Sequence, residues 1–208
     1  MELQEKKHII TIGGMLGSGK SSTAQLVAER LNYTHYSAGD VMRQLGKEQG
    51  IDDIRAFNIA SEGKKKFDYE VDERTKLIGK TETNVVFDSH MAWRFIPNSF
   101  KVFLNLDETA AAERILAGMT PERRSSEEVP DSVAGYAGLL KERKASNVRR
   151  YVDLYQVNPY APELYDFVVE TSQHSLSEVA DIVIDAYNAW LGYHSDCKSA
   201  RFLLQSLA

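Results

Sequence analysis

Residues suited to phosphate chemistry lie near the amino end of the chain, in a segment that reads G-x-x-x-x-G-K-S from Gly14 to Ser21. Its glycines allow the backbone to turn so that successive N–H groups point at phosphate oxygens. An apolar run at residues 8–12 precedes it and a helical apolar pattern follows, so a helix N-terminus would add partial positive charge. We predict that Lys20 holds the β- and γ-phosphates of a nucleotide and that Ser21 ligates Mg²⁺. The predicted nucleotide contacts are Gly14, Met15, Leu16, Gly17, Ser18, Gly19, Lys20, Ser21 and Ser22.

A second Mg²⁺ ligand is predicted at the end of a later strand. Residues 84–88 read Asn-Val-Val-Phe-Asp, an apolar run that ends in Asp88, as in a buried parallel strand that ends in an acid. Ligands of parallel sheets lie beyond the carboxyl ends of the strands, so Asp88 would reach the metal directly or through water. Ser89 follows it, where many ATPases that hydrolyse have a carboxylate to orient water, and this favours transfer to a bound acceptor.

Phosphoryl transfer also requires cations around the moving group, because negative charge develops on it. Arg143, Ser146 and Arg150 are spaced i, i+3 and i+7 in a segment that we expect to be helical, so they would share one face. We predict Lys20, Arg143 and Arg150 as the catalytic residues.

Two further pairs are candidates for binding the acceptor. Asp40 and Arg43 are one helical turn apart, and Arg43 could take an acceptor phosphate with bidentate hydrogen bonds. Asp40 could hold Arg43 in place or accept a hydrogen bond from a sugar or base. His90 and Arg94 follow Asp88 at i, i+4 spacing and would both face the site if a helix begins there.

The elements that must position these residues alternate along the chain. The pattern predicts strands at residues 8–12, 33–36, 84–88, 100–106 and 167–171. It predicts helices after the phosphate segment and at residues 41–49 (after a turn at 39–40), 52–62, 68–78, 108–117, 132–156 and 179–191. The buried contacts expected on the third and fourth helices are Phe57, Ile59, Phe67, Val71 and Leu77. Asp107 should cap one helix, and Ser175 with Glu178 should form a capping box before the last. This alternation predicts an α/β fold of the P-loop NTPase type, with three αβα layers and a five-stranded parallel sheet.

The composition limits the remaining classes of function. The chain has 208 residues, of which 43% are hydrophobic, so one domain with a substantial core is expected. A net charge of −5 argues against wide nucleic-acid binding, and no apolar run approaches the length of a membrane span. Cys197 is the single cysteine, and the five histidines lack metal-ligand spacing. We expect a cytoplasmic protein that binds neither nucleic acid nor membrane and is a monomer or a weak homodimer.

The chain resembles the cytidylate kinases of the short, archaeal-like type over roughly residues 8–190. Besides the phosphate segment, it has the motifs S-A-G-D-x-x-R at residues 37–43 and R-x-x-S-x-x-x-R-Y at residues 143–151 in register. The resemblance implies transfer of the γ-phosphoryl group of ATP, with Mg²⁺, to a nucleoside monophosphate, CMP or dCMP. It also implies one kinase domain at residues 1–191, with an acceptor-binding helical insert at about 38–80 and a lid at about 119–131. Residues 192–208 would form a C-terminal tail.

Several positions depart from the family pattern and leave alternatives open. His90 stands where an arginine is expected and Arg94 where a histidine is expected, so Arg94 is hypothesised to replace the missing cation. Asn147 stands in place of a glutamate, and Arg123 and Arg124 are weaker lid candidates. The alternatives are a P-loop kinase for a different small-molecule acceptor and a non-catalytic regulatory protein that binds ATP.

Overall fold

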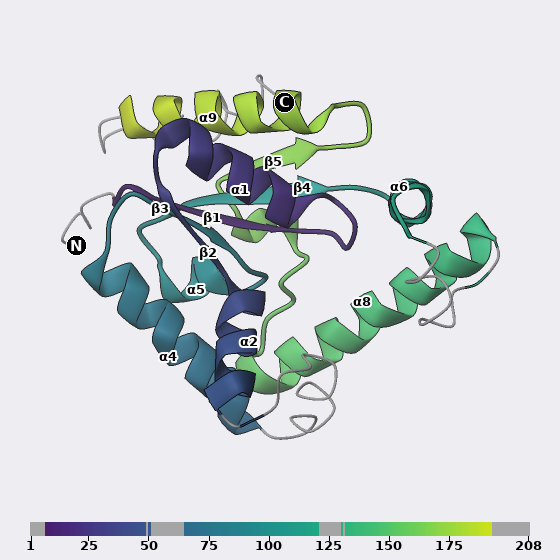
Figure 1. Cartoon of the computed structure of the whole chain (residues 1–208), viewed down its shortest axis with the longest axis horizontal. Helices are drawn as coiled ribbons and strands as arrows, with labels where there is room; N and C mark the ends of the chain where they lie inside the picture. Colours follow the sequence, from purple (N-terminus) through teal and green to yellow (C-terminus); the bar gives the residue numbers. More distant parts are fainter. Residues whose placement is uncertain (1–6, 49, 51–64, 121–129, 131, 193–208) are drawn as a thin grey trace.

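Five parallel strands form the sheet of this protein. The structure is a computed structural model, and it describes residues 7–48, 50, 65–120, 130 and 132–192 (Figure 1). The strands are β1 (Ile9–Gly14), β2 (Thr34–Ser37), β3 (Val85–Asp88), β4 (Phe100–Asn105) and β5 (Phe167–Glu170), and their order in the sheet is β2-β3-β1-β4-β5. Every neighbouring pair is parallel, which confirms the predicted α/β fold with a five-stranded parallel sheet.

Helices cover both faces of the sheet. They are α1 (Lys20–Leu31), α2 (Ala38–Glu48), α4 (Lys65–Thr81), α5 (Ala92–Phe95), α6 (Glu108–Ala117), α8 (Val133–Tyr155) and α9 (Leu176–Gly192), with a 3₁₀ turn at Pro162–Leu164. Side chains of a strand alternate between faces. On β1, Ile10 and Ile12 therefore pack in a core cluster with α1 and α9, whereas Ile9 packs with α5. Figure 1 shows α1 and α9 together on one side of the sheet and α4, α5 and α8 on the other.

Local capping signals placed several helices correctly. The Asp107 carboxylate accepts hydrogen bonds from the backbone N–H groups of Thr109 (2.9 Å) and Ala110 (3.0 Å), so α6 begins where the sequence predicts. Ser132 caps α8, which runs without interruption to Tyr155 and confirms the long predicted helix. Such caps can be read from sequence because donor and acceptor lie within three residues of each other.

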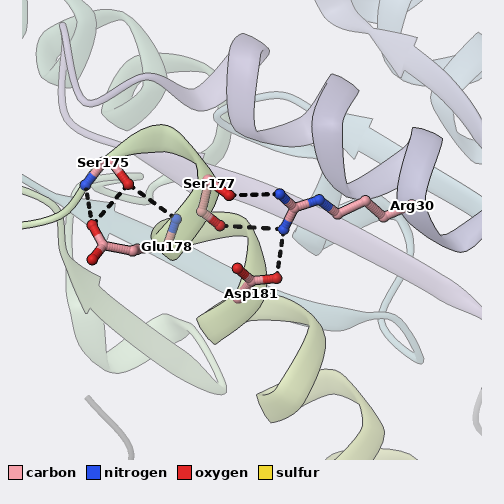
Figure 2. Close-up of polar contacts among 5 residues, drawn as sticks. All are labelled: Arg30, Ser175, Ser177, Glu178 and Asp181. Carbon is pink, nitrogen blue, oxygen red and sulfur yellow. Dashed lines mark hydrogen bonds and ion pairs between the residues drawn. The ribbon is translucent and has the colours of Figure 1, made fainter.

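The capping box before α9 is also confirmed. The Ser175 N–H and hydroxyl both donate to Glu178 Oε2 at 2.7 Å, and the Glu178 N–H donates back to Ser175 Oγ at 3.3 Å (Figure 2). Beside it, the Arg30 guanidinium of α1 donates to Asp181 Oδ1 at 2.5 Å and to the Ser177 hydroxyl at 2.7 Å. This contact ties α9 to α1, the helix that follows the phosphate segment.

Two predictions about the acceptor side were wrong. The turn predicted at residues 39–40 is the first turn of α2, because the Ser37 hydroxyl accepts from the N–H groups of Gly39 (3.1 Å) and Asp40 (3.4 Å) and so starts the helix at Ala38. Leu77, predicted to be buried, is 59% exposed on α4, which is longer than predicted at both ends. The predicted helix at residues 52–62, with Phe57 and Ile59, and the side chain of Phe67 lie outside the described residues.

Candidate active site

The phosphate segment, residues 14–21, is held in shape by main-chain contacts, and it is called the P-loop below. The Met15 N–H donates to the Leu104 carbonyl of β4 at 2.9 Å, and the Ser18 hydroxyl donates to the Met15 carbonyl at 2.8 Å. Gly14 has φ +146°, and a Cβ on it would lie 2.4 Å from the Leu104 oxygen, so only glycine fits there. The P-loop therefore takes its form from its own backbone and from β4.

Lys20, Ser21 and Asp88 come together at the carboxyl edge of the sheet. In the β1–β3 register Ile12 pairs with Asp88, and the Ser21 hydroxyl donates a hydrogen bond to Asp88 Oδ2. Lys20 Nζ donates to the Met15 carbonyl at 2.9 Å. Burial lowers the pKa of Lys20 to about 8, and the nearby Asp88 carboxylate partly offsets this. The Lys20 ammonium group has lost most of its contact with water, so a bound phosphate would supply the negative charge that stabilises it.

The donor set at this edge fits Mg²⁺. A serine hydroxyl and one carboxylate are oxygen ligands, and Mg²⁺ in phosphate sites usually takes one or two carboxylates together with substrate oxygens and water. Within the described ranges no group of three or more His, Cys, Asp and Glu side chains could hold a metal by itself. A metal here would depend on phosphate oxygens as well as on Ser21 and Asp88.

A pocket of about 310 Å³ adjoins the P-loop on the α1 side. It is lined by Ser18, Gly19, Ser22, Thr23, Arg114, Thr171, His174, Ser175, Leu176 and Val179. Arg114 Nη2 donates to the Thr171 carbonyl at 2.7 Å, which joins α6 to the turn after β5. The G-x-x-x-x-G-K-S motif predicts only the P-loop side of this pocket. The other wall comes from segments that the pairing of β4 with β5 brings together, and no local motif signals it.

One face of helix α8 packs against the rest of the protein, and its side chains are called the α8 stripe below. The stripe consists of Tyr136, Leu140, Lys144, Asn147, Tyr151 and Tyr155. Arg143 and Arg150 each precede a member of the stripe, so their shared face is turned by about 100° from it. Arg150 Nη2 contacts Asp68 Oδ1, so Arg150 reaches α4, and the Arg143 side chain is exposed.

The rings of His90 and Tyr160 pack against each other, and each is within the electrostatic reach of a predicted catalytic residue. The His90 ring lies 5.1 Å from the Tyr160 ring, and Lys20 is the charge that acts on His90. Burial raises the pKa of the Tyr160 hydroxyl, and the hydrogen bond from Asn147 and the charge of Arg143 oppose that rise. Lys20 and Arg143 are therefore both close enough to this pair of rings to affect their pKa values.

His90 lies next to the P-loop, but the interpretation that it shares a helical face with Arg94 was wrong. Helix α5 begins at Ala92, two residues after His90, and Arg94 is exposed. His90 Nδ1 is buried and has no hydrogen-bond partner among the described residues. Burial and the charge of Lys20 lower the pKa of His90 well below its usual value, so the ring is neutral. The Trp93 indole N–H donates to the His90 carbonyl at 3.0 Å and fixes the turn.

Asp40 and Arg43 form the predicted pair at the start of α2. Arg43 Nη2 donates to Asp40 Oδ1, and both side chains are more than half exposed. Strand β2 ends at Ser37, which is paired with Asp88 in the sheet, so α2 leaves the same edge on which the P-loop stands. Of the predicted lid, residues 121–129 and 131, which include Arg123 and Arg124, lie outside the described residues.

Comparisons with known proteins are consistent with this geometry. A family model described as an AAA domain matches residues 10–133. The cytidylate kinase of Methanocaldococcus jannaschii is 34% identical over 179 residues, which cover 86% of this chain and 96% of that protein. The S-adenosylmethionine-dependent nucleotide dehydratase of Lacinutrix mariniflava is 30% identical over 178 residues, covering 86% of this chain and 35% of that protein. The solved shikimate kinase of Bacteroides thetaiotaomicron superposes with a TM-score of 0.58 at 10% identity, covering 85% of this chain and 96% of that one. At this identity, the likeness shows a shared fold alone.

Proposed function

Because this chain belongs to the cytidylate kinase family, we propose that it transfers the γ-phosphoryl group of Mg·ATP to CMP or dCMP, giving the nucleoside diphosphate and ADP. The observation that supports this most is that Lys20, Ser21 and Asp88 meet at the sheet edge from which α2, the helix that carries Arg43, starts. The residues proposed to bind the phosphoryl donor and those proposed to bind the acceptor therefore lie at the same edge of the sheet, as direct transfer requires.

The donor nucleotide would lie along the P-loop. The amides of residues 14–22 and Lys20 bind the triphosphate, and the 310 Å³ pocket beside Ser22 takes the rest of the nucleotide. Ser21 and Asp88 would hold Mg²⁺, which supplies positive charge to the β- and γ-phosphate oxygens when bound. Ser89 offers no carboxylate to orient water after Asp88, which supports transfer over hydrolysis.

The acceptor would lie between α2, α4 and α8. Arg43, oriented by Asp40, would bind the acceptor phosphate, while Arg143 and Arg150 stabilise the charge that develops on the moving group. This assignment makes α2 and α4 parts of the acceptor insert at about 38–80 and residues 119–131 the lid. His90 would donate or accept one hydrogen bond at the meeting point of the two phosphates, since its Nδ1 is buried beside Lys20.

An acceptor panel with Mg·ATP tests the proposal. ADP formation is followed with CMP, dCMP, UMP, AMP and common hydroxyl metabolites, and Lys20→Met, which should lose about 10³-fold or more in kcat/KM, serves as the control for catalysis by this chain. We expect base-selective turnover with CMP or dCMP. Turnover with a hydroxyl metabolite alone would indicate a different acceptor. ATP binding without acceptor-dependent ADP release would indicate a regulatory protein.

A different small-molecule acceptor is the second candidate, and one observation favours it. His90 provides a neutral ring where the family pattern has a cation, so the acceptor side carries less positive charge than that pattern implies.

Arg94 remains the predicted replacement for the missing cation. If Arg94 supplies that positive charge, Arg94→Ala lowers turnover with CMP at least tenfold. Turnover within twofold of the wild type would remove Arg94 from the site.

A further inference from the structure

Two side-chain bridges join α4 to the C-terminal half of α8. In the first, Arg150 of α8 donates to the Asp68 carboxylate, 82 residues away in the chain. In the second, the Tyr155 hydroxyl donates to Asp72 Oδ2 at 2.6 Å. Asp68 and Asp72 are one turn apart, so both bridges leave the same face of α4. Figure 1 shows the first turns of α4 meeting the end of α8 below the sheet.

The Arg150 guanidinium contacts both Asp68 and the Tyr151 ring. The Asp68 side chain is only 17% exposed, whereas that of Arg150 is 49% exposed. A largely buried carboxylate therefore binds a guanidinium that is still accessible from solvent. The Tyr151 ring lies 5.9 Å from the Arg150 guanidinium carbon and supports it from α8. Burial would lower the pKa of Arg150, but Asp68 and other groups raise it, so the guanidinium keeps its charge.

We propose that Asp68 is a positioning residue for phosphoryl transfer, which acts by fixing the orientation of Arg150 toward the acceptor. The proposal rests on the proposed function, in which Arg150 is one of the two arginines that stabilise the moving phosphoryl group. A guanidinium has five N–H donors in one plane, so it can keep Asp68 on one edge and present another edge to phosphate. Asp68 lies on α4, in the proposed acceptor-binding insert, so its contact would orient Arg150 relative to the segment that binds the acceptor.

The second bridge supplies a matched control. Tyr155→Phe removes a contact between the same two helices but leaves Arg150 and Asp68 in place. If Asp68 merely held α4 against α8, breaking either bridge would affect turnover to the same degree. If Asp68 acts through Arg150, only its own loss affects the chemical step.

Steady-state kinetics with the full chain, Mg·ATP and the acceptor found active in the panel test this. We expect Asp68→Asn to lower kcat about tenfold with an unchanged KM for ATP, and Asp68→Glu to restore most of it, because positioning partners typically contribute 10–100-fold. Tyr155→Phe should stay within about twofold. In an Arg150→Ala background, Asp68→Asn should change kcat by less than about twofold, since two residues that act as one unit are not additive. A tenfold effect of Asp68→Asn in that background, or equal losses in Asp68→Asn and Tyr155→Phe, would overturn the proposal.

A spectroscopic measurement separates this proposal from the choice of acceptor. The Arg150 Nε–H signal is followed by ¹⁵N NMR in the presence of Mg²⁺ and a non-hydrolysable ATP analogue, and it is assigned from its loss in Arg150→Lys. We expect a distinct signal in the wild type and in Tyr155→Phe, and an averaged one in Asp68→Asn. An unchanged signal in Asp68→Asn would contradict the positioning role even if the kinase reaction is confirmed. A wild type that is inactive on every monophosphate but shows the expected signals would contradict only the proposed function.

Discussion

The P-loop and the α4–α8 side of the site are built by different kinds of contact. Around the P-loop most of the contacts end on the main chain: Met15 N–H donates to the Leu104 carbonyl, and the Ser18 and Lys20 side chains donate to the Met15 carbonyl. The neighbouring strands are buried. On the α4–α8 side they are ion pairs between partly exposed side chains, such as Arg150 with Asp68 and, on α2, Arg43 with Asp40. In the proposed function, the ATP-binding side is therefore held by buried backbone contacts, whereas Arg43 on the acceptor side can exchange Asp40 for a phosphate.

Energetics explain why the two halves differ in this way. An exposed ion pair contributes only about 0–1 kcal/mol, so a phosphate can displace the carboxylate on Arg43 at little cost. Reshaping the P-loop would break buried backbone hydrogen bonds, each costing about 1–3 kcal/mol if left unpaired. In the proposed function, a rigid donor site beside an acceptor site that can exchange the partner of Arg43 suits an enzyme that must keep water out until both substrates are bound.

Among the variants that test the contrast between the two halves, the largest effect is expected from adding one carbon to the P-loop. In Gly14→Ala the new Cβ would lie 2.4 Å from the Leu104 carbonyl oxygen, so β1 and β4 must separate or the loop must change. We expect at least a 100-fold loss of kcat/KM together with weaker ATP binding, because backbone donors preorganised for phosphate would be displaced. Calorimetric titration with Mg·ATP and the kinase assay measure both. Unchanged ATP binding would show that the P-loop is less rigid than its contacts indicate.

On the acceptor side, removing a side chain should weaken the binding of one substrate only. Arg43→Met keeps most of the length of the side chain but loses the charge. We expect the KM for the acceptor to rise about 10–100-fold, because a lost charge-assisted contact typically costs 1.5–3 kcal/mol, and the KM for ATP to stay the same. Lys47→Met, at the exposed end of α2, is the matched control and should behave as the wild type. Equal rises in both KM values would place Arg43 at the donor side instead.

The donor half could be predicted from sequence because its determinants are local. The G-x-x-x-x-G-K-S segment, the apolar strand before it and Asp88 at the end of β3 all indicate their own structure within a few residues. The caps of α6 and α9 are equally local. The sequence also predicted that Arg143 and Arg150 share a face, since helical spacing requires no knowledge of neighbours.

Features that depend on distant segments could not be predicted. Leu77 matches the apolar spacing of a buried residue, but only the packed structure shows that its side of α4 faces solvent. His90 lies in a turn because α5 starts late, and i, i+4 spacing alone cannot reveal that. No local sequence pattern marks Asp68 as part of a site. Its proposed role depends on its contact with Arg150, 82 positions later in the chain.

The next prediction concerns the stability of the acceptor side and its pH dependence. Burial raises the pKa of Asp72 to about 6, against a hydrogen bond from Tyr155 that lowers it. Because the folded state then binds the proton more tightly than the unfolded chain, the free energy of unfolding falls as pH rises from about 4 to 6, and the cost persists above pH 6. Since water screens part of the cost, we expect Asp72→Asn to gain about 1–2 kcal/mol at pH 7.5.

Thermal unfolding at several pH values measures this gain. The melting temperature of Asp72→Asn should exceed that of the wild type by about 2–8 °C at pH 7.5, and the difference should vanish near pH 4, where both side chains are neutral. The control is Glu73→Gln, one residue on, whose exposed carboxylate pairs with Lys76 and has a lowered pKa. It should show no gain at pH 7.5. A gain in Asp72→Asn that is independent of pH would mean that burial of the charge is not its cause.

The smallest predicted effect decides whether the acceptor half rearranges through side chains or through the backbone of α8. Gly138 is exposed in α8, and a Cβ there would meet no atom within 4 Å among the described residues, so Gly138→Ala should stabilise the protein by about 0.5–1 kcal/mol. At Gly135, three residues earlier, a Cβ would lie 2.8 Å from Pro130 Cβ, and Gly135→Ala should destabilise it. If ion pairs such as Arg43 with Asp40 exchange while α8 stays straight, Gly138→Ala raises the melting temperature and leaves kcat within twofold. If α8 must bend at this glycine, the same variant gains stability and loses turnover, and the contrast between a rigid donor half and side-chain exchange in the acceptor half fails.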